Sequence, residues 1–369
     1  MTFNKDVIKS DEKAIFALRS LYQKYGYRQY KMSKFEEYDL YARNKDFLVS
    51  DGIITFTDQG GKLMALKPDV TLSIIKNSQD GVLNKVYYNE NVYRMSGSSH
   101  SFKEIMQTGL ECIGDIDTYN ICEVIMLAVE SLSAISNDFV LDISHMGLIS
   151  DILSQVTEDT ALKNNIIKCL GEKNFHEIKA LCENSGTDSS LLELVTSVYG
   201  KGDKVLARLK EANLNESLQS HIKVLDDINE FLKENGIADK VNFDFSIACD
   251  MKYYSAIVFK GYINGIAESV LSGGQYGKLL ARMGKKADAI GFAVYLDMLE
   301  RLSTQNKKYD VDTVLLYDED ADVSALTKSI KLLTDMGTDV LASKKVPDIK
   351  YKQLLKFNGK GVEILENND

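Results

Sequence analysis

Two short stretches of the sequence carry the side chains best suited to chemistry. One is the segment 66–71, which reads Leu-Lys-Pro-Asp-Val-Thr, and the other is the segment 102–111. The second stretch alternates polar and apolar residues, as a strand with one polar face does. Because successive side chains of a strand point to opposite faces, Gln107 and Glu111 share one face with the intervening Gly109.

Asp69 and Thr71 are expected at the start of a helix over 69–76, because Pro68 suits the first turn of a helix. Two carboxylates with an amide and a hydroxyl would suit a small cationic ligand, such as an amino acid that presents an ammonium group. On spacing alone, a solvated sheet face is an equally good interpretation of the same residues.

Other kinds of site are not indicated by the sequence. The patterns G-x-x-x-x-G-K-[ST] and G-x-S-x-G are absent, and the glycine-rich segment 273–278 is interpreted as a tight strand-to-helix turn. The five cysteines form no C-x-x-C pair, and the four histidines are not at metal-ligand spacing. We therefore expect no metal site, no cofactor and no disulfide framework, as in a reducing compartment.

The composition argues against binding of nucleic acid over a large surface. The 369 residues include 54 Asp and Glu against 44 Lys and Arg, for a net charge of −10, whereas nucleic-acid-binding surfaces are usually basic. The N-terminal residues 1–13 are polar, and the most apolar run, 121–135, is interrupted by Glu123 and Glu130. We expect no signal peptide, no membrane span and a cytoplasmic location.

The order of predicted elements indicates an α+β fold rich in sheet. The first part is predicted to contain a helix over 10–25, strands over 85–94, 102–113 and 139–143, and a long apolar helix over 119–135. From about 147 to 236, amphipathic helices replace the strands, which predicts a helical insertion. Strands return at 241–247 and 253–262, and helices are predicted over 276–283 and 290–302.

The last segment predicts a small α/β tail. Its elements are expected to be a strand over 313–317, a helix over 323–336, a strand over 339–341, a helix over 349–355 and a strand over 362–365. The predicted domains are therefore 1–307, with the insertion at about 147–236, and 308–369.

Several of these segments, taken together, resemble the catalytic domain of histidyl-tRNA synthetase, a class II synthetase. Segment 66–71 is similar to that family's Leu-Arg-Pro-Glu-Gly-Thr, and segments 93–94 and 102–111 are similar to its second class-defining motif. Segment 251–255 resembles its histidine-recognition motif, and segments 273–276 and 291–293 resemble its third motif. The resemblance covers roughly residues 10–305. It implies a class II antiparallel sheet flanked by helices.

The departures from the family's motifs fall on its ATP-binding arginines. Arg94 keeps the arginine of the second motif, but Asp297-Met298 stands where the third motif has Glu-Arg. Cys249-Asp250-Met251 replaces Arg-Gly-Leu, Ser101 replaces a loop arginine, and Gln275 replaces the arginine of Gly-Arg-Tyr-Asp. Loss of one electrostatic group of this kind typically costs about 10²–10³ in rate, so several losses together should leave no useful synthetase.

The amino-acid pocket that the resemblance implies is better retained. Its residues would be Asp69, Thr71, Gln107, Glu111, Tyr253 and Tyr254. A kept pocket without the ATP clamp resembles a paralogous family, the regulatory subunits of ATP phosphoribosyltransferase. That resemblance implies a non-catalytic subunit of histidine biosynthesis that forms dimers within a hetero-octamer with the short catalytic subunit. It further implies a part in feedback inhibition, with histidine as a candidate pocket ligand.

Two other functions remain open at this point. One is an active histidyl-tRNA synthetase, and the other is a synthetase-like paralogue with a different binding role. The segment from Asp310 onward argues against tRNA binding, because it holds twelve acidic residues and eight lysines with no arginine, a balance of −4.

Overall fold

The computed structural model describes residues 8–48, 52–95, 101–212, 214–247, 253–302, 308–359 and 361–368. The start of the histidine-recognition segment, including Cys249, Asp250 and Met251, and most of the polar loop 96–101 lie outside these residues. The chain divides into two compact units, residues 1–302 and 303–369, and each is described by itself.

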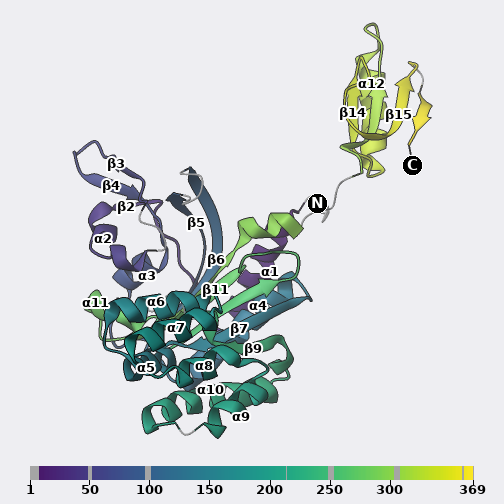
Figure 1. Ribbon diagram of the computed structural model, residues 1–369. Helices are drawn as coiled ribbons and strands as arrows, with labels where there is room; N and C mark the ends of the chain where they lie inside the picture. Colours follow the sequence, from purple (N-terminus) through teal and green to yellow (C-terminus); the bar gives the residue numbers. More distant parts are fainter. Residues whose placement is uncertain are drawn as a thin grey trace. The chain divides into compact units, whose positions relative to one another are not determined.

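The first unit is organised around a sheet in which, among the described residues, nine strands pair (Figure 1). Neighbours are antiparallel except for the parallel pairs β1–β5 and β7–β9. The predicted class II antiparallel sheet flanked by helices is confirmed. In spatial order the strands are β1 (Arg28–Gln29), β5 (Asn84–Met95), β6 (Phe102–Gly114), β12 (Asp288–Tyr295), β11 (Leu271–Gln275), β10 (Ile257–Ile263), β7 (Phe139–His145), β9 (Val241–Asp244) and β8 (Tyr199–Gly200).

Helices α1 (Ser10–Lys24) and α4 (Thr118–Ile135) pack together on this sheet. Apolar residues recur on one face of α1, and Gly26, at φ 82°, takes the left-handed conformation just after the helix. Tyr22 of α1 and Ser131 of α4 are buried and hydrogen-bonded at 3.0 Å. Among the described helices, α4 alone is long and apolar enough to span a membrane, yet most of it is buried in this core.

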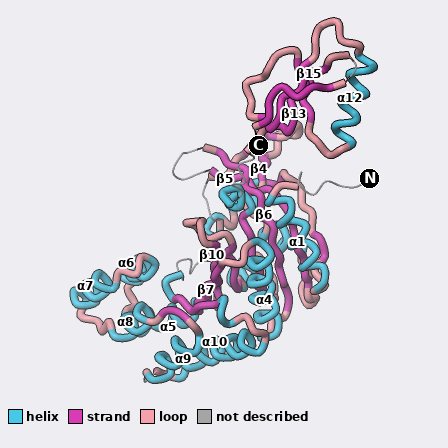
Figure 2. Tube along the Cα trace, turned by 90° about the vertical axis from the view of Figure 1, so that its right-hand side faces the viewer, coloured by secondary structure: helices cyan, strands magenta, loops and turns pink. Residues whose placement is uncertain are grey.

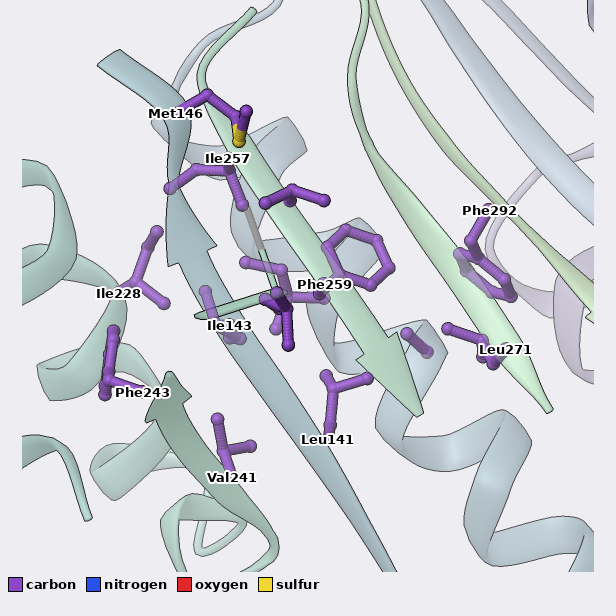
Figure 3. Close-up of a cluster of buried hydrophobic side chains, with 14 of the residues drawn as sticks. Leu141, Ile143, Met146, Ile228, Val241, Phe243, Ile257, Phe259, Leu271 and Phe292 are labelled. Carbon is purple, nitrogen blue, oxygen red and sulfur yellow. The ribbon is translucent and has the colours of Figure 1, made fainter. Parts of the chain in front are cut away.

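Between β7 and β9 the described residues form six α-helices and one short 3-10 helix, Ala238–Lys240, together with the two-residue strand β8. Figure 3 shows how this region joins the sheet: Ile228 of α10 points toward side chains of β7, β9 and β10, such as Ile143, Phe243 and Ile257. The helices are α5 (Met146–Val156), α6 (Thr160–Gly171), α7 (Phe175–Ser185), α8 (Ser190–Ser197), α9 (Gly202–Glu211) and α10 (Glu216–Glu234), and Figure 2 shows them as a group of cyan coils.

A three-stranded sheet stands beside the hairpin formed by β5 and β6. It is formed by β2 (Phe35–Glu37), β4 (Leu63–Leu66) and β3 (Thr55–Thr57), in the order β2-β4-β3. Two short helices accompany it, α2 (Tyr38–Ala42) and α3 (Thr71–Asn77), and a further short helix, α11 (Gly277–Arg282), joins β11 to β12. Buried residues of α2, α3 and α11 share one apolar cluster with Val86 and Tyr88 of β5.

Three predicted elements are wrong, and each of these segments pairs with neighbouring strands instead. Segment 290–302 was predicted as a helix but forms most of β12 and a 3-10 helix, Leu296–Leu302; segment 349–355 was also predicted as a helix and lies mostly in β15. Gly273 and Gly274 lie inside β11 rather than in a turn. Short apolar runs have no period that separates a buried strand from a buried helix, so only pairing with neighbouring strands decides.

The second unit is a four-stranded sheet with one helix. The order is β14-β13-β15-β16, in which β13 is parallel to β14 and β15, and β16 is antiparallel to β15. Leu315, Leu326, Leu355 and Phe357 form its core. The elements are β13 (Val311–Leu316), α12 (Val323–Asp335), β14 (Val340–Ser343), β15 (Tyr351–Phe357) and β16 (Val362–Asn367).

The insertion packs closely on the sheet at Gly202, the first residue of α9. A Cβ atom there would lie 2.0 Å from Asn229 Oδ1 and 2.6 Å from the Phe243 ring, and both neighbours are buried. We predict that Gly202→Ala lowers the free energy of unfolding by about 1–3 kcal/mol, because overpacking forces side chains and backbone to shift. The measurement is urea unfolding.

Gly361→Ala is the control for that measurement. Nothing lies within 4 Å of a Cβ at Gly361, and its φ is not in the left-handed region. This variant should unfold as the wild type does, and equal stability of both variants would contradict the close packing of α9 on the sheet.

Candidate amino-acid pocket

The segment between β4 and α3 is held firmly against β5. Lys67 is 1% exposed and forms an ion pair with Glu90 of β5, and its carbonyl oxygen accepts a hydrogen bond of 2.9 Å from the Tyr93 N–H. Arg94 Nε donates a hydrogen bond of 2.8 Å to the carbonyl oxygen of Pro68. Since a buried ion pair is stable only with close geometry and further hydrogen bonds, these contacts fix the backbone that leads to Asp69.

Asp69 lies at the start of α3, where its carboxyl interacts with the first turn of the helix and with Arg94. Its Oδ1 accepts a hydrogen bond of 2.9 Å from the Leu72 N–H, which satisfies a free donor of the first helical turn. Burial raises the pKa of its carboxyl, while the Leu72 bond and the Arg94 cation oppose that rise. The carboxyl therefore stands between a helix end and the guanidinium of Arg94.

Glu111 is buried on β6, only 2% exposed. Thr71 Oγ1 donates a hydrogen bond of 2.8 Å to one of its oxygens, and the Tyr276 hydroxyl donates to the other. Burial raises the pKa of Glu111 to about 8; the two hydroxyl bonds act in the opposite direction, and the charge of Asp69 adds to the rise. Burial thus favours the protonated form of the carboxyl, whereas the two hydroxyl bonds favour its ionised form.

The register of the sheet explains why a cavity exists above Glu111. Across β6, β12 and β11, Glu111 lies opposite Gly291, and Gly291 lies opposite Gly274; one step along, Gly109 lies opposite Ala293, and Ala293 opposite Ser272. A Cβ at Gly291 would lie 1.7 Å from Glu111 Oε2. The small residues at these positions therefore leave space above the sheet that larger side chains would fill. This surface of the sheet is the floor of the cavity.

Five tyrosines line the cavity: Tyr88, Tyr253, Tyr254, Tyr276 and Tyr295. The rings of Tyr253 and Tyr254 meet edge to face at 4.8 Å between centroids, and Tyr253 lies 5.8 Å from Tyr276. Burial raises the pKa of Tyr88, Tyr253 and Tyr276 well above the ordinary value, so these phenols remain neutral donors. The cavity has a volume of about 80 Å³.

The structure brings together all seven residues that the sequence marked as candidates, because each of them lines this one cavity. They are Asp69, Thr71, Arg94, Gln107, Glu111, Tyr253 and Tyr254. Sequence reasoning did not mark Tyr88, Ser272, Tyr276 and Tyr295 as pocket residues. Strand alternation through β5 would have indicated Tyr88, but Tyr295 was hidden by the wrong helix over 290–302.

Of the described residues that line the cavity, Arg94 is the only cation. Gln275 is instead structural: its Oε1 accepts a 3.2 Å hydrogen bond from the Ile257 N–H and its Nε2 donates at 3.4 Å to Asp288. Met298 packs against the apolar core. Among the described residues, no group of three or more His, Cys, Asp or Glu side chains is arranged to hold a metal ion.

Comparison with known proteins agrees with this architecture. Residues 5–299 match the family model of histidyl-tRNA synthetase. The chain belongs to the histidyl-tRNA synthetase family. Within it, the chain is 26% identical over 311 residues to an ATP phosphoribosyltransferase regulatory subunit of Oceanobacillus iheyensis, covering 82% of this chain and 76% of the relative. It is 25% identical to the Clostridium acetobutylicum subunit of the same description, covering 91% and 85%.

Solved structures show the same fold. A Bacillus halodurans protein described as an ATP phosphoribosyltransferase regulatory subunit/histidyl-tRNA synthetase superposes with a TM-score of 0.74, at 22% identity, over 96% of both chains. A chain of the Thermotoga maritima ATP phosphoribosyl transferase (HisG:HisZ) complex gives 0.62 at 22% identity, over 78% of this chain and 97% of that one. The predicted resemblance to the regulatory subunits of this synthetase-like family is confirmed.

The buried carboxyl of Glu111 predicts a pH dependence of stability. Its pKa is raised from 4.5 to about 8, so between these pH values the folded chain holds a proton that the unfolded chain has lost. Its contribution to stability is thus fully present below pH 4.5 and is lost as the pH rises to about 8. We predict that Glu111→Gln weakens the decline of melting temperature between pH 6 and 9.

The control for Glu111→Gln is Glu104→Gln on the same strand. Glu104 is exposed, and hydrogen bonds from Asn91 and Tyr93 lower the pKa of its carboxyl. Its variant should keep the wild-type slope between pH 6 and 9. A Glu111→Gln variant with that same slope would show that Glu111 is ionised in the folded chain.

Proposed function

We propose that this chain is the non-catalytic regulatory subunit of an ATP phosphoribosyltransferase, acting in the cytoplasm in the first step of histidine biosynthesis. The partner, a short catalytic subunit, joins ATP to phosphoribosyl pyrophosphate and releases pyrophosphate. This chain would contribute no group to that reaction. It would form dimers within a hetero-octamer and favour an active quaternary state of the catalytic subunit.

One observation supports this proposal most strongly. The cavity combines two carboxyls and several hydroxyls with a single cation, Arg94, among its described lining residues. A triphosphate carries several negative charges, and proteins bind it with arginines, lysines or metal ions. A cavity with this charge pattern suits a small amino acid and does not suit ATP.

We further propose that free histidine is the ligand and that it takes part in feedback inhibition. Its carboxylate would face Arg94, its ammonium group would face Asp69, and its imidazole would reach Glu111 and Thr71. A cationic group at this depth would favour the ionised form of Glu111. Regulation of this kind needs a coupling of roughly 1–3 kcal/mol between ligand and quaternary state.

The tail supports a role without tRNA. From Asp310 onward it has twelve acidic residues against eight lysines, a balance of −4. Contacts with nucleic acid depend on neutralising phosphates, so a surface of this sign is repelled by tRNA.

The experiment that tests the proposal is reconstitution with the short catalytic subunit encoded in the same genome. We expect the two chains to co-purify and turnover of the catalytic subunit to rise on addition of this chain. A histidine-dependent exchange of pyrophosphate into ATP should be absent. Measurable exchange would identify an active synthetase. If the two chains do not co-purify and turnover is not stimulated, the chain is a paralogue with another role.

A pocket variant tests the ligand. Asp69→Asn keeps an oxygen that can accept the Leu72 N–H but removes the charge, so we predict that histidine binds about 10- to 100-fold more weakly, since hydrogen bonds to charged groups contribute about 1.5–3 kcal/mol. Titration calorimetry measures this. The control is Asp39→Asn on the exposed surface of α2, where the side chain is 74% exposed. Equal affinities for the two variants would place histidine elsewhere.

A further inference from the structure

The side chains of β12 that face the cavity change size abruptly along the strand. Gly291 and Ala293 leave the floor open, and the next residue on that face is Tyr295, which also lines the cavity. In the register Tyr295 lies opposite Gln107 of β6. The open floor therefore ends at a phenol ring, two residues beyond Ala293.

Tyr295 is held in place at both ends. Its hydroxyl and the hydroxyl of Ser272 on β11 are hydrogen-bonded at 2.7 Å, and its backbone N–H donates a hydrogen bond of 2.9 Å to the carbonyl oxygen of Val270. Ser272 lines the same cavity. A side chain anchored in this way to the neighbouring strand is a fixed wall, because rotation of the ring away from the floor would break the hydroxyl bond.

The wall stands at the end of the cavity that suits a carboxylate. Along the hairpin of β5 and β6, Glu111 pairs with Val86, Gln107 with Glu90 and Lys103 with Arg94. From Glu111 the strand pair thus leads past the level of Gln107 and Tyr295 toward Arg94. A ligand whose basic group reaches Glu111 would direct its carboxylate past the level of Tyr295 toward Arg94, which lies four residues farther along β5.

We propose that Tyr295, anchored by Ser272, is a specificity-determining residue that restricts this pocket to a free amino acid. It closes the β12 side of the cavity at the level of Gln107 and excludes ligands that are extended on that side, above all an aminoacyl adenylate or another nucleotide conjugate. The inference rests on the proposed function only in naming an amino acid as the ligand. A regulatory site closed in this way responds to the free amino acid and not to its activated forms.

Titration calorimetry of the full chain with two ligands tests this proposal. The ligands are histidine and histidyl sulfamoyl adenosine, a stable analogue of histidyl adenylate. We expect wild type to bind the analogue at least about 10-fold more weakly than histidine, because a packed site resists added atoms. Tyr295→Ala should bind the analogue at least about 10-fold more tightly than wild type does, with less than about 3-fold change for histidine.

Three further variants make the result specific. Tyr295→Phe keeps the ring but loses the bond to Ser272, so it should exclude the analogue less strongly than wild type and more strongly than Tyr295→Ala. Tyr295→Thr, a β-branched residue suited to a strand, should admit the analogue even if the alanine variant is unstable. Tyr93→Ala is the matched control, because Tyr93 lies on β5, bonds Glu104 and does not line the cavity. Thermal melting verifies that each variant is folded.

The two ligands are measured separately, so the two proposals can fail separately. If wild type binds the analogue as tightly as histidine, or if neither Tyr295→Ala nor Tyr295→Thr gains affinity for it, the wall is refuted. If histidine binds no variant but the analogue gains affinity in Tyr295→Ala or Tyr295→Thr, the wall stands and the proposed ligand is wrong.

Discussion

Glu111 carries a carboxyl group buried on β6 of the main sheet, and its two oxygens accept hydrogen bonds from Thr71 and Tyr276. An unsatisfied buried carboxyl is costly, so the surrounding chain has to supply these donors. Thr71 comes from the start of α3, and Tyr276 directly follows β11. The glycine at 291 is required as well, because a Cβ there would overlap the carboxyl. One side chain thus constrains three distant segments.

The same arrangement links the pocket to the rest of the first unit. The segment from Lys67 to Asp69 is tied to β5 through Glu90 and Arg94, and β4, which precedes it, belongs to the small sheet. A ligand that changed the position of Asp69 or Arg94 would move backbone that continues into both sheets. This continuity gives a physical route by which an occupied pocket could favour one quaternary state, as a regulatory subunit requires.

Charge is the first reason for our proposal that this pocket does not hold ATP. A transferring phosphoryl group needs cations close to the developing charge. Among the described lining residues Arg94 alone is cationic. The side-chain amide of Gln275 is hydrogen-bonded to Ile257 and Asp288. Tyr295 with Ser272 adds bulk at the same end of the cavity. The single cation and the bulk of the Tyr295 side chain both disfavour binding of a nucleotide. They leave room for a small zwitterion.

Local sequence patterns were sufficient to predict those elements whose side chains repeat with the period of a strand or of a helix. Alternation predicted the long strands β5 and β6 and placed Gln107 and Glu111 on one face, and Pro68 correctly marked the approach to α3. Amphipathic spacing predicted the run of helices between β7 and β9. The resemblance to known motifs added Tyr253 and Tyr254, which no period would have connected with Glu111.

The sequence by itself thus determined the fold class, the acidic and arginine-poor character of the chain and the residues most suited to a ligand. Tertiary structure alone decided that 290–295 is a strand, because an apolar run becomes β12 only by pairing with β6 and β11. That pairing sets Gly291 beside Glu111 and Tyr295 beside Gln107. It therefore creates both the space in the pocket and the wall that limits it, through contacts between residues 180 and 188 positions apart in the chain.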